Sequence, residues 1–223
     1  MKRILLLLSL ALIFAGCTGA TPTALPPTAT PVPAPDGFRT FVVVPAESTA
    51  FYQMDEEFFA SALSKYSIDA GKKVTVGSTQ NVAGSLALNL GAAEPLGPNR
   101  FVVDLPSLTS DQSLRDGWIR DNALESSKYP EAIFVASSIQ GAPASYTDGQ
   151  EVQFQLVGDL TVRSISLPVT FDVTATLTGD TITGVAEAKV KLTDFGITPP
   201  NFADTLVVAD LFTIRIELTA REQ

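Results

Sequence analysis

Few residues in this 223-residue chain have side chains suited to covalent or metal chemistry. The chain contains one cysteine, Cys17, and no histidine. The absence of histidine excludes a Ser-His-Asp triad, zincin motifs and haem held by histidine. Carboxylate pairs, Ser/Lys chemistry and Tyr or Arg electrophiles remain, but no spacing in the sequence supports them. We therefore expect a protein that is not an enzyme, with no metal site and no cofactor.

Cys17 carries the clearest chemistry in the sequence. Lys2 and Arg3 precede an apolar run over residues 4–14, and Ala15-Gly16-Cys17 follows it. This layout is typical of a secretory signal, and the run is too short to span a bilayer as a helix. Its small-small-Cys ending is similar to the lipobox of bacterial lipoproteins. We expect residues 1–16 to be a signal peptide and Cys17 to carry a lipid anchor.

The anchor hypothesis has consequences for the rest of the chain. An ordinary signal peptide that happens to contain a cysteine is the alternative. Lipidation of Cys17 predicts an extracytoplasmic protein, in the cell envelope, periplasm or cell surface, held to the membrane by acyl chains. It also leaves the folded part without cysteine, and therefore without disulfides, a thiolate nucleophile or a Cys-based metal site.

Composition divides the remaining chain into two parts. Residues 17–37 are rich in Pro, Thr and Ala, which predicts a disordered tether that follows the lipidated Cys17. Residues 38–223 have a globular composition and are long enough for one domain with its own core. The net charge of −9 makes nucleic acid a poor partner. The sequence does not predict the oligomeric state.

Alternating hydrophobicity dominates residues 38–223. Apolar residues occupy every second position of at least four segments, 152–156, 169–177, 182–192 and 212–218, so each is expected to be a strand with one buried face. Less regular strands are expected over 38–44, 49–54, 74–79, 82–90, 101–105 and 133–138. Thr178-Gly179-Asp180 predicts a tight hairpin, and residues 92–99 a longer loop. The pattern predicts an all-β antiparallel protein, either a sandwich or a closed barrel.

Two segments depart from this alternation. Residues 55–65 are a candidate for one short helix, and residues 111–126 are a better one. In the second segment Ser113 and Asp116 have the spacing of a capping box, with Asp in place of Glu. Leu114 and Trp118 would share one face of that helix.

Charged residues near the second segment admit two interpretations. Arg115-Asp116 and Arg120-Asp121 could contact a ligand headgroup or form salt bridges, and salt bridges are favoured. The carboxylates of Glu47 and residues 55–57 match no calcium loop, so a solvated surface is favoured over a calcium site.

Three sequence blocks stand out between residues 115 and 210. The first reads RDGWIR from Arg115, followed by KYPEAIF from Lys128 and by Ser137. The second reads GDLTVR from Gly158 and ends in LPVTF from Leu167. The third reads TDFGI from Thr193, followed by VVAD from Val207. Together the three blocks are similar to the YceI-like family of secreted lipid-binding proteins. In this third block Gly196 is expected to supply a turn and Phe195 to pack inward.

The blocks also depart from the family pattern. Trp118 replaces a usual His, Leu192 a usual Arg, and Leu124-Glu125 a usual Phe-Phe. We expect these positions to lie near the mouth of a cavity. The scaffold is therefore expected to match the family, whereas the ligand can differ from that of better-known members.

The resemblance implies a lipocalin-like antiparallel barrel of about eight strands with one or two short helices. It also implies a lumen for an apolar lipid such as an isoprenoid or a quinone. Small residues on the alternating faces would open volume there, unless they pack against a bulky opposite wall. A fully packed barrel that acts as a surface interaction or structural module is the alternative. The candidate lumen residues are Trp118, Phe134, Phe154, Phe171, Ala186, Ala188 and Phe195, with Arg115 and Arg120 as candidate headgroup contacts.

Overall fold

The computed structural model describes residues 35–59, 71–92, 95–143, 145–202 and 205–223, and it confirms the all-β antiparallel fold. The predicted signal peptide, Cys17 and nearly all of the tether lie outside these residues. The strands are β1 (Arg39–Val43), β2 (Thr49–Phe58), β3 (Gly71–Thr79), β4 (Val82–Leu88), β5 (Leu96–Asp104), β6 (Glu131–Gln140), β7 (Glu151–Val162), β8 (Ile165–Thr178), β9 (Thr181–Lys191), β10 (Asn201–Phe202) and β11 (Leu206–Glu222). The α-helix is α2 (Ser113–Trp118), and single helical turns are η1 (Pro45–Glu47), η3 (Leu105–Ser107), η4 (Ile119–Ala123) and η5 (Thr193–Phe195).

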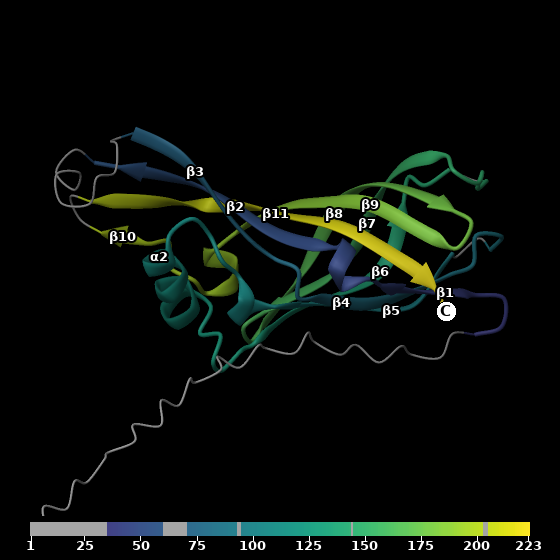
Figure 1. Cartoon of the computed structure of the whole chain (residues 1–223), viewed down its shortest axis with the longest axis horizontal. Coiled ribbons are helices and arrows are strands. Elements are labelled where there is room, and N and C mark those ends of the chain that lie inside the picture. Colours follow the sequence, from purple (N-terminus) through teal and green to yellow (C-terminus); the bar gives the residue numbers. More distant parts are fainter. Residues whose placement is uncertain (1–34, 60–70, 93–94, 144, 203–204) are drawn as a thin grey trace, which may run out of the picture.

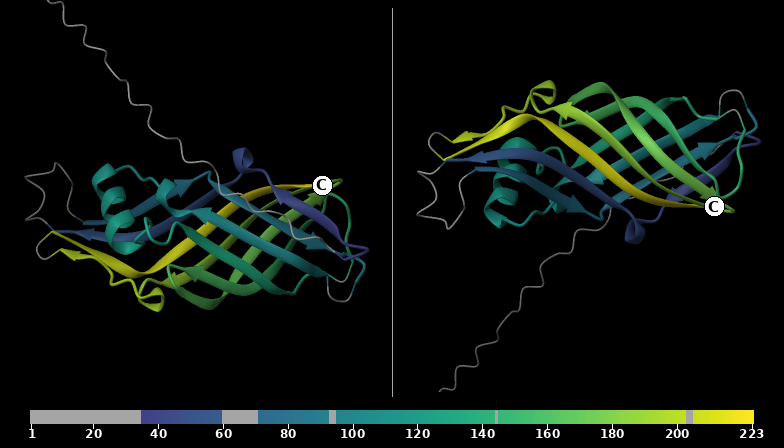
Figure 2. Two further views of the ribbon diagram at one scale, coloured as in Figure 1. Left: turned by 90° about the horizontal axis from the view of Figure 1, so that it is seen from below. Right: turned by 90° about the horizontal axis from the view of Figure 1, so that it is seen from above.

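Eight of the strands form a closed barrel. Their order is β1-β4-β5-β6-β7-β8-β9-β11, and pairing of β1 with β11 closes the ring. Figures 1 and 2 show an elongated barrel with α2 at one end and the C-terminus at the other. The prediction of a closed barrel is confirmed, and the sandwich is excluded.

The long strand β11 joins this ring to a two-stranded extension. One edge of β11 pairs with β9, whereas the other pairs first with β2 and then, past a turn of the chain at η1, with β1. Strand β3 pairs with β2 and forms the outer edge of the extension (Figure 1). The barrel wall is therefore extended by β2 and β3 at the end that carries α2.

The segment between β5 and β6 covers the opening that this extension leaves. Thr79 Oγ1 lies 2.6 Å from Ser107 Oγ, and Ser78 forms an isolated antiparallel bridge with Thr109. Helix α2 and the π-helical turn η4 follow. The helix predicted over residues 111–126 is therefore present but shorter, and it ends at Ala123.

The predicted capping box of this helix is wrong. Gln112 occupies the N-cap position, and no side chain caps the helix there. Asp116 is buried and instead accepts hydrogen bonds from the Ser110 backbone N–H (2.9 Å) and the Ser110 hydroxyl (2.6 Å). The carboxylate therefore holds the loop before the helix rather than the first turn.

Two further local predictions are corrected. Residues 55–58 belong to β2, because Glu56 and Phe58 are buried while Asp55 and Glu57 face outward, which is the period of a strand. Residues 60–65 of the predicted helix lie outside the described part. In the predicted loop over residues 92–99, β5 begins at Leu96, where it pairs with Leu88. The predicted hairpin at Thr178-Gly179-Asp180 is confirmed, with Gly179 at a φ of 60°.

Among the residues that the structure describes, no helix has the length and apolar character needed to cross a bilayer.

Candidate ligand-binding cavity

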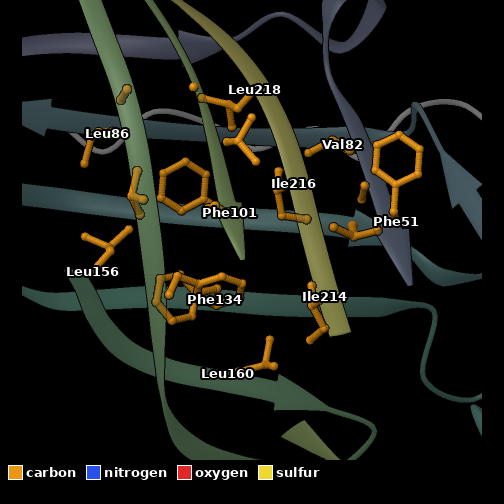
Figure 3. A pocket seen from close by; sticks show the side chains of 18 of the residues that line it. Phe51, Val82, Leu86, Phe101, Phe134, Leu156, Leu160, Ile214, Ile216 and Leu218 are labelled. Carbon is orange, nitrogen blue, oxygen red and sulfur yellow. The ribbon is translucent and has the colours of Figure 1, made fainter. Parts of the chain in front are cut away.

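A cavity of about 670 Å³ runs along the inside of the barrel. Its walls are the inward faces of the strands that the alternating pattern predicts. Figure 3 shows aromatic and aliphatic side chains from opposite walls pointing toward one another around this space. The side chains labelled there are Phe51, Val82, Leu86, Phe101, Phe134, Leu156, Leu160, Ile214, Ile216 and Leu218. The volume lies in the range of small-molecule binding sites.

Small residues on two neighbouring strands leave room for this cavity. Ala175 of β8 and Gly184 and Ala186 of β9 all border it. On the same side of the barrel, Phe134 of β6 and Phe171 of β8 pack edge to face with ring centroids 4.9 Å apart. The small residues therefore adjoin open volume, and the barrel is not fully packed.

The end of the cavity under α2 is closed by buried apolar side chains. Leu192, Phe195 and Ile197 border it there and are at most 6% exposed. Gly196 has a left-handed φ of 67°, so the turn after β9 can direct Phe195 inward, as the sequence predicts. Trp118 also borders this end and packs edge to face on Phe202, with centroids 5.6 Å apart.

An ion pair lies behind this closed end. The carboxylate of Glu56, which is 3% exposed, accepts a hydrogen bond from Arg115 Nη2 at 3.1 Å. Arg115 also contacts Asp111 (2.5 Å) and donates to the Ser110 hydroxyl (3.1 Å). Because Arg115 is already engaged by two carboxylates, it acts structurally in this state. Neither Arg115 nor Arg120 borders the cavity.

Tyr52 brings a polar atom to the same end. Its ring borders the cavity and lies over Gly77. A Cβ atom at position 77 would overlap the ring, so the close packing requires glycine there. Its hydroxyl is buried and has no hydrogen-bond partner among the described residues. Burial, followed by the negative charge of Asp116, raises the pKa of Tyr52 to about 12, so the phenol is neutral at physiological pH.

The opposite end of the cavity is its mouth. The bordering residues that are themselves exposed all belong to loops there: Ala92, Gly141, Ala142, Pro143, Ser145, Tyr146 and Gln150. The mouth expected beside Trp118, Leu124 and Leu192 is therefore at the wrong end. Those residues lie in the segments that cover the barrel, where their apolar side chains pack into its base.

Polar groups gather around this mouth. The Tyr146 hydroxyl lies 2.6 Å from Asp148 Oδ1 and 2.8 Å from the Leu177 carbonyl oxygen. Arg39 pairs with Glu222 at 2.7 Å and donates to the Gly179 carbonyl oxygen. Partial burial and the hydrogen bond to Asp148 raise the pKa of Tyr146 to about 12. The mouth can therefore offer hydrogen bonds that the interior lacks.

The structure brings most of the predicted lumen residues to one cavity. Trp118, Phe134, Phe154, Phe171, Ala186 and Phe195 border it. Ala188 does not border the cavity; it is 5% exposed and belongs to the buried apolar cluster that includes Val190 and Phe195. Sequence reasoning missed Tyr52 and Tyr146, since neither lies in the sequence blocks. Within the described ranges no group of three or more Asp or Glu side chains is arranged to hold a metal ion.

Residues 42–220 match the model of the YceI-like domain. The chain belongs to the YceI-like domain family. Protein YceI of Escherichia coli O157:H7 is 31% identical over 102 residues, which cover 43% of this chain and 49% of that protein. The chain thus spans about half the length of the curated relatives that it matches.

Solved structures show the same fold for YceI-like and related proteins. BcnA of Burkholderia cenocepacia superposes with a TM-score of 0.60 at 19% identity, covering 79% of this chain and 98% of BcnA. A polyisoprenoid-binding domain from Saccharophagus degradans also gives 0.60, at 13% identity, with coverage of 82% and 98%. The YceI protein of Campylobacter jejuni gives 0.53 at 16% identity, with coverage of 66% and 84%.

Proposed function

We propose that this YceI-like domain is a binding protein that holds one long apolar ligand, an isoprenoid or a quinone-like lipid, inside its barrel. The observation that carries the proposal is the cavity of about 670 Å³ whose walls are almost wholly apolar. Burial of apolar surface stabilises such a complex by about 25 cal/mol per Å². The Saccharophagus domain, which is described as polyisoprenoid-binding, supports the same ligand class.

The distribution of polar groups supports one orientation of the ligand. The base of the cavity is apolar. The hydroxyl of Tyr52 lies there, but it is buried and inaccessible to solvent. Ser145, Tyr146 and Gln150 stand at the mouth. The hydrocarbon tail would therefore extend toward Phe195, and the polar end of the ligand would remain between the loops at the mouth. The alternative, an interaction module with a fully packed barrel, does not account for this open volume.

The proposal includes anchoring outside the cytoplasm through a lipid on Cys17. The signal-like residues 1–16 and the tether over residues 17–37 support it. Cells that express the full chain and are fed an alkyne fatty acid should label the chain, and Cys17→Ser should abolish the label. Labelling that persists in the Cys17→Ser variant would show that the lipid is attached to another residue and would contradict the proposed anchor.

The ligand itself can be tested on residues 18–223, secreted through a cleavable signal and purified without detergent. Organic extraction and mass spectrometry should recover a lipid near one equivalent per chain. Ala186→Phe, which adds a ring to the lumen, should lower the recovered lipid at least tenfold. Thr183→Phe adds the same ring on the exposed face of β9 and is the matched control. A chain that binds no isoprenoid or quinone at micromolar concentration would refute the proposal.

A further inference from the structure

Strand β3 has an edge with no partner strand over most of its length in the described part of the chain. Ser78 exchanges two backbone hydrogen bonds with Thr109, at 2.8 and 3.1 Å, on the side away from β2. Backbone groups of an antiparallel strand alternate in direction, so Val76, Val74 and Lys72 also point their N–H and C=O groups away from β2. Three consecutive pairs of donors and acceptors therefore face outward along this edge.

The side chains on this edge are apolar where solvent exposure would favour polar ones. Val74 is 57% exposed and Val76 45% exposed, and both lie on the outer face of the extension. Proteins normally protect such an edge with charges, bulges or a covering segment. Among the described residues, Thr109 covers this edge only at Ser78, and Lys72 lies at its far end, so none of them protects the edge at Val74 and Val76.

We propose that β3 pairs with β3 of a second copy of this chain, antiparallel and across a twofold axis centred on Val74. The two extensions, each with β3 at its outer edge (Figure 1), would then form one continuous sheet in which the two β3 strands lie side by side. This pairing satisfies the outward backbone groups of all three residues and places the two Val74 side chains opposite each other.

Charge and hydrogen bonding select this register. With Val74 opposite the same residue of the partner, Lys72 lies opposite Val76, and three pairs of residues exchange hydrogen bonds. A centre on Thr75 would leave only two pairs of residues that exchange hydrogen bonds, because Lys72 would lie opposite Ser78, whose backbone groups already bond to Thr109. A centre on Lys73 or Lys72 would place two like lysines directly opposite each other, which is destabilising.

Self-complementarity identifies a second copy as the occupant. In the Val74-centred register the two Lys72 side chains lie at opposite ends of the paired segment, roughly 13 Å apart along the strand. That separation exceeds the Debye length of about 8 Å at physiological ionic strength, so their repulsion is largely screened. The two Val74 side chains lie side by side at the centre of the paired segment, each beside the Val76 of its own strand.

Cross-linking of the full chain in membranes of expressing cells can test the pairing. Cys17 is the sole native cysteine, so Val74→Cys supplies a defined site for a short bismaleimide, and the parent chain controls for any reaction at Cys17. Directly opposite residues have Cβ atoms about 5 Å apart, within reach of the reagent. Thr170→Cys is the matched control, since Thr170 is exposed on β8, a strand inside the ring, and pairs there with Val157 of β7.

We expect a band of twice the chain mass with Val74→Cys, at least fivefold stronger than with Thr170→Cys. Val76→Pro in the Val74→Cys background removes an outward N–H without touching the bonds to β2, and it should abolish the band. Its lipid content should match that of the parent, which shows that the barrel remains folded. A band no stronger than the control, one unaffected by Val76→Pro, or an adduct of another mass would overturn the proposal.

Discussion

At the end of the barrel that carries α2, none of the described residues bordering the cavity is exposed, whereas exposed loop residues such as Ala142 and Tyr146 border it at the opposite end. The charged groups differ in the same way. Glu56 is 3% exposed and meets Arg115 behind the base, while Glu222 is 32% exposed and meets Arg39 beside the mouth. The closed end is therefore expected to contribute more to stability, and the open end to allow the ligand to enter.

Phenylalanine truncation should give the largest difference between the two ends. Phe195→Ala removes a side chain that is 1% exposed, so it should lower the free energy of unfolding by about 3–5 kcal/mol. Phe154→Ala removes a half-buried ring that already adjoins open volume, and it should cost about 1 kcal/mol. Denaturant unfolding of both ligand-free variants measures the difference. Equal costs would mean that the base is no better packed than the upper barrel.

The two ion pairs should show the next largest contrast. Glu56→Gln leaves the Arg115 guanidinium with only Asp111 as a charged partner, so it should cost about 3 kcal/mol. Glu222→Gln breaks a pair that water screens, and less than about 1 kcal/mol is expected. Chemical denaturation at low and high salt compares them, and the larger effect should depend less on salt. Similar losses in both variants would contradict the proposed difference in burial.

The two phenols give the smallest and most specific contrast. Tyr52→Phe removes a buried hydroxyl with no partner, so it should change stability by less than about 0.5 kcal/mol or stabilise the fold. Tyr146→Phe removes the hydrogen bonds to Asp148 and Leu177, and it should cost about 1 kcal/mol or less. Thermal unfolding at pH 7 ranks them. A clear loss with Tyr52→Phe would reveal a partner for its hydroxyl.

Burial of Tyr52 should also make the stability of the fold depend on alkaline pH. The pKa of Tyr52 is raised to about 12 in the folded chain, from about 10 when unfolded. The unfolded state therefore loses its proton first, and stability that is present below pH 10 falls as pH rises toward 12. Tyr52→Phe should shift the alkaline unfolding midpoint upward. An unchanged midpoint would exclude Tyr52 as a cause.

Sequence reasoning predicted the barrel wall well because each wall strand has one buried face and one solvent-exposed face. Alternation identified most inward residues of β7, β8, β9 and β11, and most of these border the cavity, although Ala188 and Val190 do not. The helix prediction over residues 55–65 failed at Glu56, because a glutamate looks solvent-exposed until its partner, Arg115, is known. Glu56 and Arg115 are 59 residues apart in the sequence, so no local sequence pattern predicts that they form a pair.

The position of the mouth could not be predicted for a related reason. Trp118 and Leu192 differ from the family pattern, which suggested a role at the ligand entrance. Which end is open depends on how the segment from Leu105 to Ala123 covers the barrel and on the loops near Tyr146. Both are tertiary arrangements that alternation within a strand does not encode.

The position of β11 in the ring has a consequence for how the chain folds. Its pairs with β1 and β2, such as Val43 with Ala220 and Ala50 with Ile216, join residues near opposite ends of the domain. Closing loops of that length makes folding slow, and these contacts form only after the last strand has been synthesised. A growing chain therefore has no closed cavity until β11 is available, and ligand loading must follow the pairing of β11 with β1.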